Sequence, residues 1–284
     1  MVGLGSVGSI VVEVLARMGL QHLVLLDFDS LEVINRDRTL HAHRDNAGMG
    51  YAKVTVAGRA ARRSATAADF LVEELESSVC EDDGYRAALD CDVLFSCVDR
   101  PWARSVLNHI AYAHLIPVVD GGIHVSRTAQ GRMRGAEWKA HVAAPGRRCL
   151  RCLQQFDPAF VQAEREGHLD DPSYIESLPN ESVLRRNENV FAFSLAAASL
   201  EVLQLVSMVI GPAGIDDYGG QTYHMATGTL ETAPSTCEAR CAYPGFTGRG
   251  EQGPHPGTGV HPRAESARAV RIVAGASRER GGLE

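Results

Sequence analysis

A glycine-rich loop near the start of the chain, Gly3-Leu4-Gly5-Ser6-Val7-Gly8, constrains the fold more than any other feature. An apolar segment at helical spacing follows over residues 10–18, and after it come the apolar run 23–26 and an acid, Asp27. This order is typical of a nucleotide-binding α/β fold, in which Gly3, Gly5 and Gly8 bring the backbone close to a phosphate and Asp27 bonds a ribose hydroxyl. The pattern does not separate NAD from ATP, and a plain glycine turn followed by a surface aspartate stays open as the alternative.

Strand-like apolar runs alternate with helix-like segments through the first part of the chain. This alternation predicts a Rossmann-like α/β fold with a mostly parallel sheet and helices on both faces. Such a fold needs a strand directly before the glycine loop. Only Met1 and Val2 precede Gly3, so we expect the first strand to be truncated and the natural protein to begin upstream. The expected strands cover residues 69–72, 92–97 and 115–119, and the expected helices cover 51–63, 83–89 and 102–113.

The rest of the chain is less regular. Residues 131–155 have the composition of a basic, cysteine-containing loop, and residues 157–189 that of a polar, turn-rich insertion. A last strand-like stretch covers residues 221–230. We therefore expect one domain over residues 1–245, followed by a disordered tail over residues 246–284, which is rich in glycine and proline and lacks apolar periodicity.

Charge and hydropathy exclude some partners. The formal net charge of −7 leaves no electrostatic footprint for nucleic acid or anionic lipid. The long apolar run 190–210 carries Glu201 and Gln204 in its middle, which favours a core helix over a membrane span. Because no secretion signal is recognisable at the start, we expect a cytoplasmic protein. Only two of the 28 basic residues are lysines, Lys53 and Lys139.

Five elements in a fixed order are similar to the ThiF/MoeB superfamily, whose members activate ubiquitin-like and sulfur-carrier proteins. They are the glycine loop, an acidic strand end, an Asn-x-x-Arg pair, a lysine on the next helix and an aspartate after a later strand. The resemblance covers about residues 2–245. It implies ATP-dependent adenylation of the C-terminal glycine carboxylate of a carrier protein, with release of pyrophosphate. The matching residues after the loop are Asp27 and Asp29, Asn35 and Arg38, Lys53, and Asp99.

The chemistry of adenylation explains why these residue types are needed. A carboxylate must approach a phosphate chain that carries about four negative charges, so cations at that point lower the barrier. The resemblance implies that Asn35, Arg38 and Lys53 bind the phosphates and that Asp99 holds Mg²⁺. Other roles stay open: Arg38 and Lys53 as surface charges, and Asp99 as a helix N-cap. A NAD-dependent oxidoreductase and an inactive nucleotide-binding scaffold are the rival functions.

Seven cysteines fall into two groups. Cys149 and Cys152, together with Cys237 and Cys241, form two closely spaced pairs, which predicts a structural zinc site with four thiolate ligands. Two local disulfides or a redox pair are the alternatives.

The remaining cysteines have other expected roles. We expect Cys91 and Cys97 to pack in the core. Superfamily members that carry a thioester generally place the reacting cysteine between the two pairs, where this chain has none. The resemblance therefore implies that the chain forms the acyl-adenylate without holding a thioester, unless Cys80 serves.

The partner implied by the resemblance is a small protein with a Gly-Gly C-terminus. An extended tail without side chains needs room, which Gly121 and Gly122 could leave, although an ordinary turn explains them equally well. The insertion at residues 157–189 is placed to cover such a tail. Superfamily members dimerise, so a homodimer is expected, with neither nucleic acid nor membrane as partner.

Overall fold

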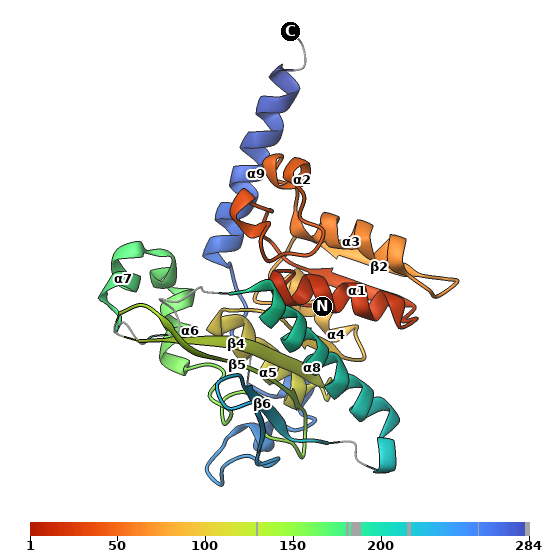
Figure 1. Cartoon of the computed structure of the whole chain (residues 1–284), viewed down its shortest axis with the longest axis vertical. Coiled ribbons are helices and arrows are strands. Elements are labelled where there is room, and N and C mark those ends of the chain that lie inside the picture. The colour runs from red at the N-terminus through yellow and green to blue at the C-terminus, as the bar shows by residue number, and fades with distance from the viewer. Residues whose placement is uncertain (129, 180–181, 183–188, 215–216, 255, 282–284) are drawn as a thin grey trace.

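The computed structural model describes residues 1–284 except 129, 180–181, 183–188, 215–216, 255 and 282–284. Its centre is a sheet in the order β2-β1-β3-β4-β5-β6-β7, where Val2 bridges β1 and β3 in parallel (Figure 1). The pairs β1-β2 and β3-β4 are parallel, and β5, β6 and β7 extend the sheet in antiparallel order. The strands are β1 (His22–Leu26), β2 (Leu71–Leu75), β3 (Leu94–Ser96), β4 (Val118–Arg127), β5 (Met133–Ala143), β6 (Gly220–His224) and β7 (Thr229–Ala233).

The residues before the glycine loop lie where the fold requires its central strand. The amide of Val2 donates to the carbonyl of Phe95 at 2.9 Å, and the amide of Leu26 donates to the carbonyl of Met1 at 2.8 Å. Met1 and Val2, directly ahead of Gly3, therefore make the parallel hydrogen bonds that connect β1 with β3.

Helices cover both faces of the sheet, which confirms the predicted α/β architecture. In β1, Leu23 and Leu25 belong to one core, whereas Val24 and Leu26 pack into the other. A strand that is apolar on both faces belongs in the interior of a parallel sheet. One core is closed by α1 (Ser6–Arg17), α3 (Lys53–Ser64) and α8 (Phe191–Ile210), and the other by α4 (Asp82–Leu89) and α5 (Pro101–Ala113).

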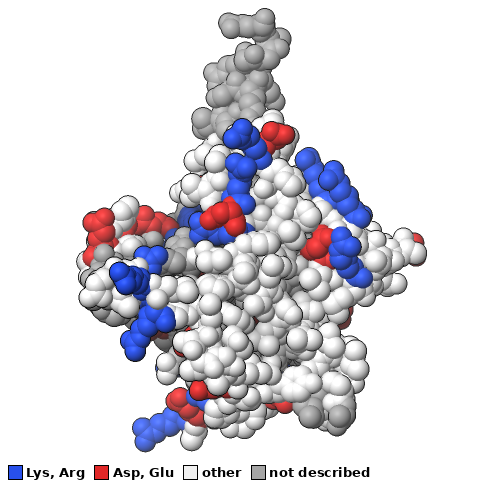
Figure 2. All heavy atoms as spheres, viewed as in Figure 1, with Lys and Arg blue, Asp and Glu red and all other residues white. Residues whose placement is uncertain are grey.

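The long apolar helix α8 is a core helix, as predicted. It is long and apolar enough to cross a membrane, but half of its most apolar window is buried in the fold, where it packs on α1, β4 and β5. Glu201 and Gln204 are both buried within this packing. The surface over α8 is largely uncharged (Figure 2), and Leu203, Val209 and Ile210 are exposed there.

The prediction of a loop over residues 131–155 is wrong for Met133–Ala143, which form the strand β5. This strand pairs with β4 along most of its length, and Gly122 lies opposite Lys139. Glu137 and Lys139 face a cavity described below. The other face of the strand buries the small residues Ala136 and Ala140, so the apolar alternation that marks a strand is weak. The insertion contains α6 (Pro158–Arg165) and α7 (Pro172–Ser177), and residues 180–181 and 183–188 of it lie outside the described residues.

The tail predicted to be disordered instead folds onto the domain. It contains the helix α9 (Pro262–Gly281), whose first residues include the buried Ala264. Arginines hold this helix: Arg268 donates twice to Glu81, at 2.6 and 2.8 Å, and Arg271 donates to the carbonyl of Phe28 at 2.6 Å. Apolar periodicity could not reveal this order, because charge-assisted hydrogen bonds supply much of the attachment. The short α-helix α2 (Arg44–Gly48) lies between β1 and α3 in the chain.

Candidate functional site

A cavity of about 890 Å³ opens at the carboxyl ends of the parallel strands, where α/β folds bind their ligands. Its volume lies in the range of small-molecule sites. The glycine loop, the end of β1 and the segment after β3 form one half of it, and β4 and β5 form the other. The sequence-predicted residues that line it are Gly3, Gly5, Asp27, Asp29, Asn35, Arg38, Lys53 and Asp99.

The glycine loop packs too closely for side chains at two positions. Gly3 has φ +86°, and an added Cβ would lie 2.5 Å from the carbonyl oxygen of Cys97. Gly8 does not line the cavity; an added Cβ there would collide with the carbonyl oxygen of Gly3. At Gly5 an added Cβ would meet no protein atom, because this residue borders the open cavity. The loop therefore presents bare backbone and the first turn of α1 to a ligand.

Asp27 ties the glycine loop to the end of β1. One of its carboxylate oxygens accepts the amide of Leu4 at 2.7 Å, and the other accepts the amide of Asp29 at 2.7 Å. Burial raises the pKa of the Asp27 carboxyl above its ordinary value, and the neighbouring Lys53 opposes this rise. Asp27 is therefore a fixed hydrogen-bond acceptor at the end of β1.

Lys53 begins α3 and is bound to Asp29 twice. Its amide donates to the Asp29 carbonyl at 3.0 Å, and Nζ lies 2.8 Å from Oδ2. The Lys53 side chain is only 13% exposed, so it is not an ordinary surface lysine. Burial works to lower its pKa, but Asp27 and Asp29 outweigh burial and raise the pKa of Lys53 above its usual value. The cavity thus holds a permanently charged ammonium group.

Asn35 and Arg38 lie on the short segment after β1. The Asn35 side chain accepts the amide of Glu32 at 3.2 Å, and Arg38 Nε lies 3.0 Å from Asp37. Asp99 follows β3. The N-cap of α5 is Arg100, so the alternative role of Asp99 as a helix N-cap is wrong. Asp99 faces the cavity with its carboxylate near Lys53 instead.

The second half of the cavity is built on β4 and β5. Arg104 fixes its floor by donating to Asp120 at 3.1 Å and to the carbonyl of Gly121 at 2.9 Å. Lys139 lines this half, and burial lowers the pKa of its ammonium group, with Arg104 adding to the effect. No hydrogen bond or ion pair holds Lys139 Nζ among the residues described. The backbone of Gly122, which has no side chain, and the poorly solvated ammonium group of Lys139 therefore lie side by side.

Glu201 and Cys97 meet at the base of the cavity. Cys97, predicted as a core residue, lines the cavity and donates from Sγ to Glu201 at 3.3 Å. Glu201 is 1% exposed, and burial together with Asp120 raises its pKa well above the ordinary value. Its Oε1 fills the space that a side chain at Gly121 would need. Burial raises the pKa of both Cys97 and Cys80 well above the ordinary thiol value, so neither is an activated nucleophile.

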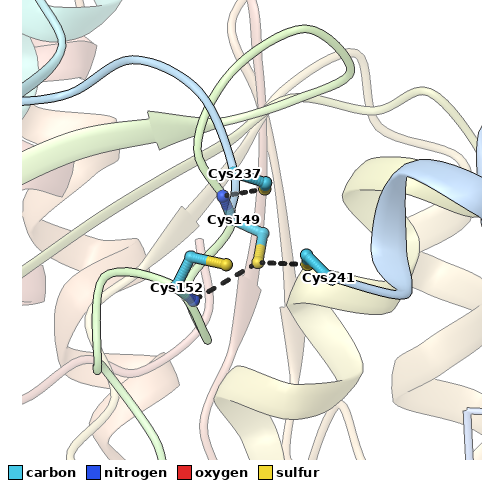
Figure 3. A group of neighbouring side chains, drawn as sticks. All are labelled: Cys149, Cys152, Cys237 and Cys241. Atoms are coloured by element: carbon cyan, nitrogen blue, oxygen red, sulfur yellow. Dashed lines mark hydrogen bonds between the residues drawn. The ribbon is translucent and has the colours of Figure 1, made fainter. Parts of the chain in front are cut away.

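The four predicted metal ligands come together at the far end of β5 (Figure 3). The Sγ atoms of Cys149, Cys152, Cys237 and Cys241 lie within 4.8 Å of one another, and those of Cys149 and Cys241 are 3.6 Å apart. A tetrahedral zinc ion with bonds of about 2.3 Å spaces its sulfur ligands by about 3.8 Å. All seven cysteines are free thiols, so the cluster could hold zinc, and the disulfide alternative is wrong.

Some cavity residues were not expected from the sequence. Lys139 carried one signal, its rarity in an arginine-rich chain, although no pattern placed it in the site. His261 and Arg263 also line the cavity, and they come from the tail that seemed disordered. Leu169 and Ile175 of the insertion border it too.

The comparisons with known proteins agree with this geometry. The sequence pattern of the ThiF family matches residues 1–238. The molybdopterin-synthase adenylyltransferase of Escherichia coli is 32% identical over 54% of this chain and 57% of its own length. The SAMP-activating enzyme E1 of Haloferax volcanii is 27% identical over 60% of this chain and 56% of its own.

Solved structures of E. coli MccB share the fold. One of them, determined with ATP, gives a TM-score of 0.62 at 16% identity and covers 85% of this chain and 64% of that one. The chain spans between 56% and 64% of the length of these three proteins. The match to the family pattern extends over most of the sequence, and the chain therefore belongs to the ThiF family.

Proposed function

We propose that this protein binds ATP with Mg²⁺ in the cavity and adenylates the C-terminal glycine carboxylate of a ubiquitin-like or sulfur-carrier protein. The proposal makes it a ThiF-type adenylyltransferase. One observation carries it: Arg38, Lys53 and Asp99, distant along the chain, line a single cavity beside the glycine loop. Relatives named as adenylyltransferase and as activating enzymes support the same reaction class.

The residues of the nucleotide half would act on the charge of the reaction. A carboxylate oxygen of the carrier attacks the α-phosphorus, the bond to the β-phosphate oxygen breaks, and pyrophosphate leaves with the electron pair. Lys53 and Arg38 would stabilise the negative charge that moves onto the phosphates, and Asn35 would orient them. Mg²⁺, bound by Asp99, would supply further positive charge when present. Asp27 would hold the ribose.

The second half of the cavity would take the tail of the carrier protein. Gly122 leaves the backbone of β4 without a side chain, and Lys139 lies opposite it with an ammonium group to which no described residue is bound. A glycine tail lying there would point its carboxylate toward the glycine loop. Burial of Cys80 and Cys97 supports an acyl-adenylate as the product, without transfer to a thiol of this chain.

Zinc and a homodimer complete the proposal. The donor set and spacing of the four cysteines fit a closed structural zinc site, which would tie the segment after β5 to the segment after β7. The exposed apolar face of α8, with Leu203, Val209 and Ile210, is the surface we expect a second copy to cover. Free thiols suit the reducing cytoplasm.

Exchange of labelled pyrophosphate into ATP tests this function. The candidate carriers are small proteins ending in Gly-Gly that are encoded beside this chain, and the matched control is the same carrier without its last two residues. Exchange that requires the intact tail supports adenylation. ATP binding without any carrier-dependent exchange would indicate a scaffold, and quenched or shifted nicotinamide fluorescence with NADH would indicate an oxidoreductase.

A further inference from the structure

The C-terminal arm, residues 257–271, lies against the nucleotide half of the cavity although the ThiF family match ends at residue 238. Its loop is fastened to the domain by the carbonyl of Gly257, which accepts Trp102 Nε1 at 3.2 Å, and by the amide of Gly259, which donates to the carbonyl of Cys80 at 2.8 Å. The arm is therefore an addition to the family domain.

Two aromatic residues of the domain hold His261 of the arm in place. Its ring stacks on Trp102 with centroids 5.2 Å apart and an interplanar angle of 9°, and it lies 4.9 Å from the ring of Phe28. His261 is buried, and Nε2 is 3.4 Å from a carboxylate oxygen of Glu164. This stacking brings the first turn of α9 to the end of β1.

Arg263 reaches the acids that border the nucleotide half. Its guanidinium lies 3.5 Å from Oδ2 of Asp29, the oxygen that also binds Lys53, and 5.9 Å from the centroid of Phe28. Burial disfavours its charge, but Asp29 and Asp99 outweigh burial and raise the pKa of Arg263, so the group stays charged. Without it, Lys53 and Arg100 would be left to offset the charge of Asp29.

The position of the arm identifies the part of a nucleotide that it would meet. If the phosphates lie over the glycine loop and the ribose at the end of β1, the cavity leaves room for the base toward the segment after β2. Ser77, Ser78 and Val79 form that segment and line the cavity together with His261 and Arg263. A nucleotide bound in this way would have its ribose and base next to the arm.

We propose that the C-terminal arm completes the ribose and base end of the nucleotide site, and that Arg263 is a nucleotide-positioning residue. It fixes Asp29 and Phe28 and offsets the acids that would repel an anionic ligand. This inference rests on the proposed ATP site and adds to it a wall from outside the family domain. It makes nucleotide affinity depend on residues that follow the adenylation domain in the chain.

Calorimetric titration of the full chain with ATP and with AMP, both with Mg²⁺, tests the proposal. Arg263→Gln should weaken binding of both nucleotides by roughly tenfold, since a charge-assisted contact is lost. Arg263→Lys, which keeps the charge, should recover part of the affinity. Arg62→Gln is the matched control, because it removes an arginine–carboxylate pair of the same kind, with Glu74, away from both the arm and the cavity.

Each outcome has one meaning. Unchanged ATP affinity in Arg263→Gln overturns the inference and leaves the proposed function standing. Tighter binding would make the arm an inhibitory cover, and weaker ATP binding with unchanged AMP binding would assign Arg263 to the outer phosphates; both overturn it. If the wild-type chain binds no ATP, the proposed function fails and the inference with it.

A measurement on the wild-type chain covers the case in which Arg263→Gln does not fold. Trypsin cleaves after Arg263, Arg268 and Arg271, all within the arm. Bound ATP should slow cleavage at these three sites, because a nucleotide in contact with the arm would hold it on the domain. Cleavage in the arm at the same rate with and without saturating ATP would contradict the proposal.

Discussion

Lys53 is the residue on which the proposed chemistry depends most directly. Its ammonium group sits between Asp29 and the cavity, and both Asp27 and Asp29 favour its charge. Lys53→Met keeps the length of the side chain and removes the charge, so carrier-dependent pyrophosphate exchange should fall roughly 10²- to 10³-fold. Lys53→Arg should also be impaired, since a planar guanidinium cannot replace the compact ammonium group.

Arg62→Met is the control for this prediction. Arg62 belongs to the same helix, but it pairs with Glu74 at the surface and does not line the cavity. Its exchange rate should match that of the wild type. Wild-type exchange in Lys53→Met would rule out the proposed role of the lysine.

Glu201 should make the stability of the protein depend on pH. Its pKa is raised in the folded chain by burial and by Asp120, so the folded state keeps a proton that the unfolded state releases. The associated stability is complete below the unfolded pKa and declines as pH rises through the folded one. Glu201→Gln removes this decline. Its melting temperature relative to the wild type should therefore increase between about pH 5 and pH 8.

Thermal unfolding of both proteins across this range measures the effect. A constant difference in melting temperature would show that Glu201 has the same protonation behaviour in the folded and unfolded chains. Activity is not needed for this test, which separates it from the catalytic proposals.

At the scale of single residues, the sequence predicted the polar motif but not its surroundings. Asp29 and Lys53 were predicted as site residues because the order of residue types in the motif is specific. Lys139 and Arg263 belong to no such order, and only the pairing of β5 with β4 and the folding back of the arm bring them to the cavity. Contacts made by chain reversal leave no local pattern in the sequence.

The junction of the glycine loop with α1 is the element on which nucleotide access depends, and it offers a matched pair of substitutions. Gly8→Ala would place Cβ against the carbonyl oxygen of Gly3, which cannot move without disturbing the loop. The expected cost is about 1–3 kcal/mol of unfolding free energy. Gly5→Ala adds the same methyl group where no protein atom lies within 4 Å, so stability should be kept.

The order of the two variants should be reversed for ATP binding: Gly5→Ala, the more stable one, should bind ATP more weakly. Because Gly5 borders the cavity, its added methyl group would intrude on the space for the phosphates and weaken ATP binding in calorimetry. Folded Gly8→Ala should bind better than Gly5→Ala. Full ATP affinity in Gly5→Ala would mean that the phosphates lie elsewhere.

Elements differ in how far the sequence determines them. The strands β1, β2 and β3 and the helices α3, α4 and α5 were predicted within a few residues, because each buries apolar side chains at its own period. The strand β4, expected over 115–119, instead covers Val118–Arg127. The strand β5 was missed because its buried face includes the small residues Ala136 and Ala140, which make the apolar alternation weak. The helix α9 was missed because it attaches through arginine contacts, such as Arg268 with Glu81, rather than through an apolar stripe.

At the scale of the whole molecule, the cavity is assembled from segments between Val2 and Arg263. The glycine loop, the end of β1 and the segment after β3 converge because parallel strands end at one edge of the sheet. The antiparallel strands β5 and β6 extend that sheet beyond the nucleotide half and support the half assigned to the carrier tail. The fold therefore joins the proposed nucleotide site, whose motif the sequence predicts, to the proposed carrier side, which only the three-dimensional structure displays.

The cysteine cluster should stabilise the whole chain through zinc. It connects residues after β5 with residues after β7, which are far apart in sequence. The purified protein should contain about one zinc ion per chain, and removal by a chelator should lower the melting temperature by more than about 5 °C, because binding energy of a closed thiolate site contributes to folding. Cys149→Ser should do the same and lose the metal.

Cys91→Ser is the control for the zinc prediction, since Cys91 lies outside the cluster and its Sγ donates to the carbonyl of Ala87 at 3.3 Å. It should keep the full zinc content measured by elemental analysis. Cobalt substituted into the wild-type chain should give thiolate charge-transfer bands that Cys149→Ser weakens. A metal-free wild-type protein whose melting temperature does not respond to added zinc would show that packing and hydrogen bonds alone hold the four thiols together.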